Sequence, residues 1–195
     1  MVKHIIKPEV LEQKKSYESK YVSVREDRVL FKRETEDGKI EKVERTYYIT
    51  EMHNFVIVIV KRSDEILLIN QYRYPVRKFS NEFVAGIIDD GEDAEETAKK
   101  ELLEEAGIKA EKLTPLGKIF PLVGQTNAYA HIYLASGAIE EVPPRPEIFE
   151  KFVSLTHRWV SLNQFRDMVV SGRINNAPTL AAWALLTEYL NKGNQ

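Results

Sequence analysis

Two short hydrophobic segments near the middle of the chain constrain its fold more than any other feature. Residues 55–60 and 66–69 are apolar without interruption, and the polar pair Ser63-Asp64 lies between them. Short apolar runs bounded by turn residues are typical of strands that are buried on both faces. Such strands need cover on each side, and helix-forming segments recur along the rest of the chain. The sequence therefore predicts a sheet sandwiched between helices.

The N-terminal part of the chain predicts a separate small β element. Residues 21–33 and 40–50 flank the turn Glu36-Asp37-Gly38-Lys39, and Asp-Gly is a strong signal for a hairpin turn. The first arm alternates apolar and polar residues, so the hairpin buries one face only. An isolated hairpin is marginally stable in water unless something covers its apolar face.

Local patterns predict further strands, three helices and a loop. The strands are expected at residues 116–120, 128–134 and 152–160, and a proline-rich loop at residues 140–150. The helices are expected from Asp93 to Ala106, from Ser161 to Gly172 and from Asn176 onward. Capping residues or a proline mark the helix starts, and glycines end the first two helices.

Composition excludes several classes of function. The formal net charge is -2 and no stretch is dense in Lys and Arg, so a nucleic acid partner is not expected. The chain has no cysteine, which rules out disulfides, thiolate zinc sites and a cysteine nucleophile. Residues 1–10 lack the apolar core of a signal peptide, and no apolar run is long enough to span a bilayer. We therefore expect a cytoplasmic protein without a membrane partner.

Three glutamates in the helix predicted at residues 93–106 carry the main chemical signal. Glu101, Glu104 and Glu105 stand at positions i, i+3 and i+4, so a helix brings them to one face, opposite an apolar face. Three carboxylates on one face repel each other unless a cation neutralises them. Mg²⁺ takes oxygen ligands and keeps positions for water and phosphate. For an acidic helix taken alone, the alternative is a solvated surface.

The residues around this helix favour the metal site. The segment GIIDDGEDAEETAKKELLEEAGI, residues 86–108, resembles the signature of the Nudix hydrolase superfamily. The positions in register are Gly86, Glu92, Glu101, Leu102, Glu104, Glu105, Gly107 and Ile108, and Lys100 replaces the motif's arginine. The resemblance implies an α+β fold, an α/β/α sandwich with a mixed sheet. It also implies an enzyme that uses Mg²⁺, with Mn²⁺ as an alternative.

By the same resemblance, the metal ligands are Glu101, Glu105 and the backbone carbonyl of Ala85. Glu104 is a further ligand or an orienting group, and Glu101 and Glu104 are expected to act in catalysis. Lys100 keeps the charge of the motif arginine but loses its planar, two-pronged contact. Either the acidic residues are oriented more weakly, or the protein has lost its activity. We favour the first outcome because all the glutamates that would bind metal remain.

Segments on either side of this motif indicate which branch of the superfamily the chain resembles. Residues 70–76, residues 81–86 and Pro121 resemble the ADP-ribose pyrophosphatase branch. In that layout residues 1–50 form a β domain that packs across a homodimer and helps to build the partner's nucleotide pocket. Residues 51–195 then form the hydrolase domain.

The branch also implies where substrate is held. Arg73 is a candidate phosphate or ribose contact, since a guanidinium pairs with phosphate in two-pronged fashion. Asn127 lies near the place of an acidic residue in the branch, so substrate contacts there are expected to differ. Glu147 and Glu150 lie in the segment that carries a glutamate which positions or deprotonates water. Of these two we prefer Glu150 as the catalytic residue and assign Glu147 to substrate binding.

The expected function is hydrolysis of the pyrophosphate bond of a nucleotide sugar by metal-activated water. ADP-ribose is the favoured substrate, with AMP and ribose 5-phosphate as products. Two alternatives stay open: a hydrolase of another nucleotide sugar such as GDP-mannose, and a non-catalytic nucleotide-binding protein that keeps the fold.

Overall fold

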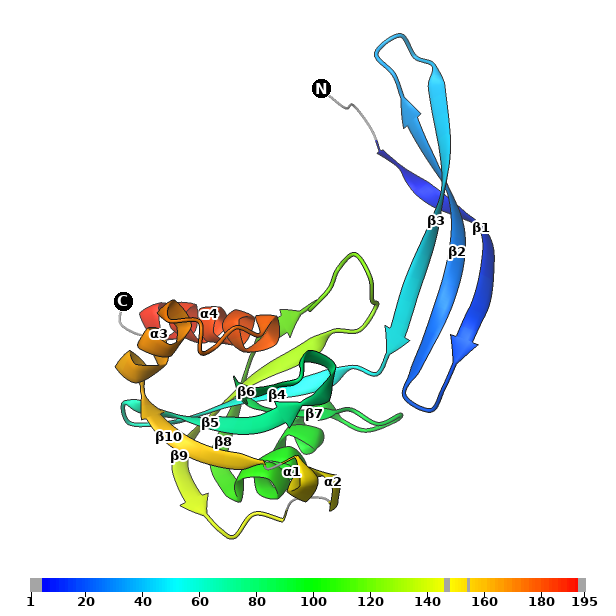
Figure 1. Ribbon diagram of the computed structural model, residues 1–195. Coiled ribbons are helices and arrows are strands. Elements are labelled where there is room, and N and C mark those ends of the chain that lie inside the picture. The colour runs from blue at the N-terminus through cyan, green and yellow to red at the C-terminus, as the bar shows by residue number, and fades with distance from the viewer. Residues whose placement is uncertain (1–4, 146–147, 154, 193–195) are drawn as a thin grey trace. The chain divides into compact units, whose positions relative to one another are not determined.

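The computed structural model describes residues 5–145, 148–153 and 155–192 (Figure 1). The chain divides into two compact units. The first comprises Met1–His53 and Leu122–Ala128, and the second comprises Asn54–Pro121 and Tyr129–Gln195.

The first unit is an antiparallel sheet of three strands in the order β1-β2-β3. The predicted hairpin is confirmed as β2 (Val22–Glu34) and β3 (Ile40–Met52), and Gly38 adopts a φ of 78° in the turn. An additional strand, β1 (Ile5–Glu18), pairs with β2. This strand was not predicted from the sequence, because three register shifts interrupt its pairing with β2 and its apolar residues do not alternate regularly.

Apolar side chains on one face of this small sheet remain exposed. Register places Val10 opposite Val29 on β2, and Val43 opposite Phe31. Because directly paired residues share a face and alternate residues do too, these four side chains form a cross-strand apolar row. Val29 is buried, whereas Val10 and Val43 are 54% and 63% exposed. The residues that the structure describes therefore cover this row only in part.

The second unit is built on a mixed sheet of seven strands. The strands are β4 (Phe55–Arg62), β5 (Glu65–Arg73), β6 (Lys78–Glu82), β7 (Val84–Ile87), β8 (Ile108–Ile119), β9 (Ala130–Glu141) and β10 (Thr156–Ser161). Their order is β10-β5-β4-β9-β8, with β6 paired to β5 and β7 paired to β4. β4 and β9 are parallel and the other pairs are antiparallel. The expected α+β fold with a mixed sheet is confirmed.

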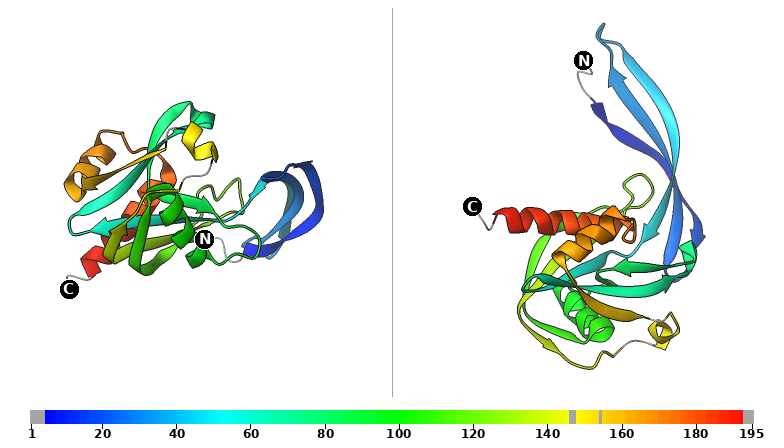
Figure 2. Two further views of the ribbon diagram at one scale, coloured as in Figure 1. Left: turned by 90° about the horizontal axis from the view of Figure 1, so that it is seen from below. Right: turned by 60° about the vertical axis from the view of Figure 1, so that its left-hand side comes forward.

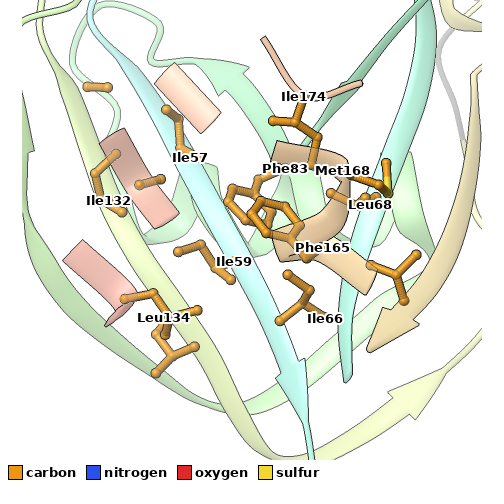
Figure 3. Close-up of a cluster of buried hydrophobic side chains, with 14 residues drawn as sticks. Ile57, Ile59, Ile66, Leu68, Phe83, Ile132, Leu134, Phe165, Met168 and Ile174 are labelled. Atoms are coloured by element: carbon orange, nitrogen blue, oxygen red, sulfur yellow. The ribbon is translucent and has the colours of Figure 1, made fainter. Parts of the chain in front are cut away.

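Helices cover both faces of this sheet. Figures 1 and 2 show α1 (Ala94–Ala106) on one face and α3 (Leu162–Val170) with α4 (Ala177–Lys192) on the other. Each layer has its own cluster of buried apolar side chains. On the α3–α4 side, Phe165 stacks on Phe83 with ring centroids 5.4 Å apart (Figure 3). The ring of Phe165 also lies 4.5 Å from that of Trp183, measured between centroids. β4 and β5 feed side chains into both clusters, as their uninterrupted apolar sequence predicts.

The helix starts follow the predicted capping residues. Asp93 accepts hydrogen bonds from the backbone N–H groups of Glu95 and Glu96 at the start of α1. Ser161 and Gln164 form the predicted capping box of α3. Asn176 accepts a hydrogen bond from the backbone N–H of Thr179 at the start of α4.

Several predicted boundaries are wrong. β8 begins at Ile108, well before the predicted strand at residues 116–120, because it is a half-exposed strand at the sheet edge with two register shifts. The predicted loop at residues 140–150 is shorter, since β9 extends to Glu141 and a short helix, α2 (Ile148–Phe152), follows. The predicted strand at residues 152–160 accordingly begins only at Thr156.

The structure contains no helix, within its described residues, with the length and apolar character that crossing a membrane requires.

Candidate active site

The segment from β6 to β7 forms the strand side of the candidate site, which faces helix α1. β6 pairs with β5, with Glu82 opposite Ile69, whereas β7 pairs with β4, with Val84 opposite Val58. The chain therefore changes partner strand at Phe83, whose side chain is buried in the core. This change leaves the backbone after Phe83 paired with β4 on one side, and α1 packs against β7.

Helix α1 presents the glutamates of the motif to this segment. Its apolar face buries Ala98, Leu102 and Ala106. Glu105 belongs to the same stripe, three residues after Leu102, and is only 5% exposed. The expectation that all three glutamates lie opposite the apolar face is therefore wrong for Glu105, which stands at the border of the packed surface.

Glu101 lies directly over Gly86. A Cβ atom built on Gly86 would lie 2.1 Å from the carboxyl carbon and one carboxyl oxygen of Glu101. No side chain fits in that space, so the glycine allows the carboxylate to rest against the β7 backbone. The close contact explains why the chain has a glycine at this position.

Glu105 is bonded to the residue before that glycine. The backbone N–H of Ala85 donates a hydrogen bond to Oε2 of Glu105 over 3.2 Å. In an extended strand, the N–H and C=O of one residue point to the same side. The Ala85 carbonyl is therefore directed to the side of β7 on which Glu105 lies.

Lys100 stands among acidic side chains at the exposed edge of α1. The charge of Glu104, followed by those of Glu101, Glu92 and Asp89, raises the pKa of Lys100. Glu92 is in turn held by the Thr97 hydroxyl, which donates to it over 3.2 Å. Lys100 thus supplies the positive charge of the motif arginine as a point charge, without the planar fork.

Arg73, the predicted phosphate contact, ends β5 and pairs with Glu82 at the end of β6. Its Nε donates to Oε1 and Oε2 of Glu82 over 3.0 and 3.2 Å, and its Nη2 lies 2.5 Å from Oε2. The hydrogen bonds to Glu82, then the charges of Glu82 and Glu105, raise the pKa of Arg73. The role of Glu82 was not predicted, because nothing in the local sequence signals a partner nine residues away on another strand.

The other residues predicted to bind substrate or act in catalysis are Asn127, Glu150 and Glu147. Asn127 belongs to the first unit and is exposed. Glu150 lies in α2, between β9 and β10, and only its backbone is described. Glu147 lies outside the described residues.

The donor set at α1 and β7 fits a hard divalent cation. It consists of the carboxylates of Glu101 and Glu105 and the carbonyl of Ala85, all oxygen donors. In the part of the chain that the structure describes, no group of three His, Cys, Asp or Glu side chains could hold a metal ion. Mg²⁺ needs fewer protein ligands than that, since it keeps waters and substrate phosphates in its remaining positions.

Comparisons with known proteins show the family of the chain. A family model described as NUDIX domain matches residues 51–182. The chain is 30% identical over 134 residues to an ADP-ribose pyrophosphatase of Bacillus subtilis, a match covering 67% of this chain and 70% of that protein. It is also 30% identical over 118 residues to a CMP-5'-(N-acetyl-N-hydroxy-3-aminopropyl)phosphonate hydrolase of Streptomyces rubellomurinus, covering 60% of this chain and 55% of that protein.

A solved structure supports the fold over nearly the whole chain. The crystal structure of an ADP compounds hydrolase superimposes with a TM-score of 0.77 and 24% sequence identity, covering 98% of both chains.

The contact between Gly86 and Glu101 generates a first prediction. Gly86→Ala should displace the Glu101 carboxylate and weaken the binding of Mg²⁺ or Mn²⁺ on the order of tenfold or more. The melting temperature should change little, because the clashing atoms are the far end of a flexible side chain. Calorimetric titration of each cation measures the affinity. The matched control is Gly124→Ala, whose added Cβ meets no atom within 4 Å. Unchanged affinity in Gly86→Ala would remove Glu101 from the metal site.

Proposed function

The chain belongs to the NUDIX family, and from that premise we propose that it hydrolyses the pyrophosphate bond of a nucleoside diphosphate sugar. The proposed substrate is ADP-ribose, which with one water gives AMP and ribose 5-phosphate. The observation that carries the proposal is the contact of Glu101 and Glu105 with Ala85-Gly86, inside the matched region. This arrangement gathers oxygen donors where a diphosphate and its cation need them.

The acidic residues hold the cation. We assign Glu101, Glu105 and the Ala85 carbonyl as ligands of Mg²⁺ or Mn²⁺, with Glu104 as a further ligand or an orienting group. A divalent cation held by these residues would neutralise charge on the diphosphate and lower the pKa of a water molecule. The burial of Glu105 and its hydrogen bond from the Ala85 N–H support its role, because both hold the carboxylate against the β7 backbone beside the Ala85 carbonyl.

Hydrolysis of the pyrophosphate bond needs a group that accepts the proton of water and a positively charged group that binds the phosphate. Water adds to one phosphorus, the bridging P–O bond breaks, and the leaving phosphate keeps the bridging oxygen. Glu150 is the proposed acceptor of the water's proton, on the ground of its place in the segment between β9 and β10. Arg73 is the proposed phosphate contact. Its guanidinium interacts electrostatically with Glu105, a proposed metal ligand, so it lies near the place proposed for the diphosphate.

Two rival functions remain testable. The relative from Streptomyces rubellomurinus is named for a CMP-linked phosphonate, so a relative at this level of identity is named for another nucleotide. Another nucleotide sugar such as GDP-mannose is therefore the first alternative. The second is a nucleotide-binding protein without activity, which Lys100 in place of the motif arginine would favour. The preserved glutamates and their contacts favour an enzyme.

Removing one anionic ligand tests the metal assignment. Glu105→Gln keeps the size of the side chain and its hydrogen-bond acceptor but removes the charge, so the rate should fall by about two orders of magnitude or more. The control on the same helix is Glu96→Gln, at an exposed position paired with Lys99, which should keep the wild-type rate. Product formation is measured by chromatography, and circular dichroism checks the fold. A wild-type rate in Glu105→Gln would refute the assignment.

A substrate panel tests the branch. The metal recognises the diphosphate, which all nucleotide sugars share, so selectivity must come from groups around the base and sugar. We expect a higher kcat/KM for ADP-ribose than for GDP-mannose, UDP-glucose or a nucleoside triphosphate. If one of these exceeds ADP-ribose by about tenfold, the substrate assignment is wrong and the hydrolase assignment stands. If none is cleaved in the presence of Mg²⁺ or Mn²⁺, the protein is not the proposed enzyme.

We also propose that the chain forms a homodimer through its first unit. The apolar row of Val10, Val29, Phe31 and Val43 has two strongly exposed members, and a second copy of the same sheet would cover them. Sedimentation at micromolar concentration should show twice the 22.5 kDa chain mass. Val43→Glu should shift the protein toward monomer, whereas Lys42→Glu, on the opposite face, should not. A monomeric wild-type protein would contradict the proposal.

A further inference from the structure

We infer that Glu82 is a positioning residue, which holds Arg73 so that the free edge of its guanidinium meets a phosphate oxygen of the substrate. The inference rests on the proposed function and adds to it a residue outside the 86–108 motif, together with the contact through which that residue acts.

The geometry of the pair leaves one edge of the guanidinium available. Glu82 accepts from Nε and Nη2 of Arg73, with three atom pairs between 2.5 and 3.2 Å. A guanidinium carries five N–H donors in a rigid plane. Contact along the Nε–Nη2 edge fixes that plane and leaves the two hydrogens of Nη1 and one of Nη2 directed away from Glu82. This second edge has the spacing that a phosphate binds in two-pronged fashion.

The burial of Glu82 sets this pair apart from ordinary surface ion pairs. Its side chain is 12% exposed. The acids in the other ion pairs described in the second unit, namely Glu65, Glu95, Glu96, Glu140 and Glu141, are 44–71% exposed. Removing a carboxylate from water costs free energy that an ion pair with a half-exposed arginine does not fully return. A requirement for a fixed arginine accounts for the arrangement better than stability does.

The positions of Arg73 and Glu82 in their strands place this ion pair near the proposed metal ligands. Glu82 ends β6, three residues before Ala85, whose N–H binds Glu105. Arg73 ends the neighbouring strand β5. Its hydrogen bonds to Glu82, and then its electrostatic interaction with the carboxylate of Glu105, raise the pKa of Arg73. The free edge of Arg73 therefore serves the same region as the carboxylates of α1.

Glu82 also keeps Arg73 from competing with the cation. An arginine beside acidic metal ligands can pair with them and occupy the oxygens that the metal needs. Glu82 occupies the Nε–Nη2 edge of Arg73, so that this edge is not offered to Glu105, whose Oε2 accepts a hydrogen bond from the Ala85 N–H. The second carboxylate thus separates the cationic group that binds phosphate from the anionic groups that bind metal.

A double-mutant cycle tests the inference. Glu82→Gln keeps the shape and removes the charge, and Arg73→Lys keeps the charge and removes the fork. Each should lower kcat/KM for ADP-ribose on the order of tenfold to a hundredfold, chiefly through KM. The double variant should be no worse than the weaker single variant, because Glu82 acts through Arg73. The control Glu65→Gln, which breaks the ion pair with Arg62 at the β4–β5 turn, should leave kcat/KM within about twofold of the wild-type value.

Binding of a methylene-bridged, uncleavable ADP-ribose analogue separates the possible failures. If the wild-type protein neither binds the analogue nor cleaves ADP-ribose, the proposed function is wrong, and this inference falls with it. If wild type does both and Glu82→Gln changes only the melting temperature, the pair is structural and the inference alone is wrong. Effects that multiply in the double variant would also overturn it. Should Glu82→Gln fail to fold, Glu82→Asp replaces it, because the shorter acid keeps the charge but shifts the guanidinium.

Discussion

The site depends on the close approach of helix α1 to strand β7. Gly86 has no side chain, so the Glu101 carboxylate can lie against the strand, and Glu105 can reach the backbone N–H of Ala85. This approach in turn requires the chain to leave β5 and join β4 at Phe83, which the core buries. Packing of the apolar stripe of α1 on the sheet then sets the height of the glutamates above the backbone. A change in any of these contacts would move charged groups that work only at short range.

Sequence patterns predicted those parts of the structure that local rules determine. The uninterrupted apolar runs gave β4 and β5 as central strands, and capping residues gave the starts of α1, α3 and α4. The spacing of Glu101, Glu104 and Glu105 predicted a shared helical face, but the burial of Glu105 depends on how α1 sits on the sheet. β1, β6 and β7 were missed because bulges and a change of partner strand hide their alternation. Pairing between distant strands decides these elements, and no local window contains it.

The relation of Arg73 to Glu82 shows the same limit at the level of a single contact. The sequence marks Arg73 as a candidate, because arginine suits phosphate, but it also permits a surface arginine at a strand end. Only the neighbouring strands reveal that a nearly buried carboxylate holds the guanidinium plane. The likeness to solved and curated relatives supports the fold and the family. It does not by itself choose a substrate, since relatives at 30% identity are named for different nucleotides.

The charges of the site explain why cation and substrate belong together. Asp89, Glu92, Glu101, Glu104 and Glu105 lie along one loop and helix. Lys100 lies on the same helix, and the charges of Glu104, Glu101, Glu92 and Asp89 raise its pKa. A diphosphate approaching these carboxylates is repelled unless further positive charge is present. Arg73 contributes little net charge while Glu82 neutralises it, although its free edge can still donate hydrogen bonds. Under the proposed function, most of the compensation would come from the divalent cation assigned to Glu101 and Glu105, and the protein side chains would orient the substrate rather than neutralise it.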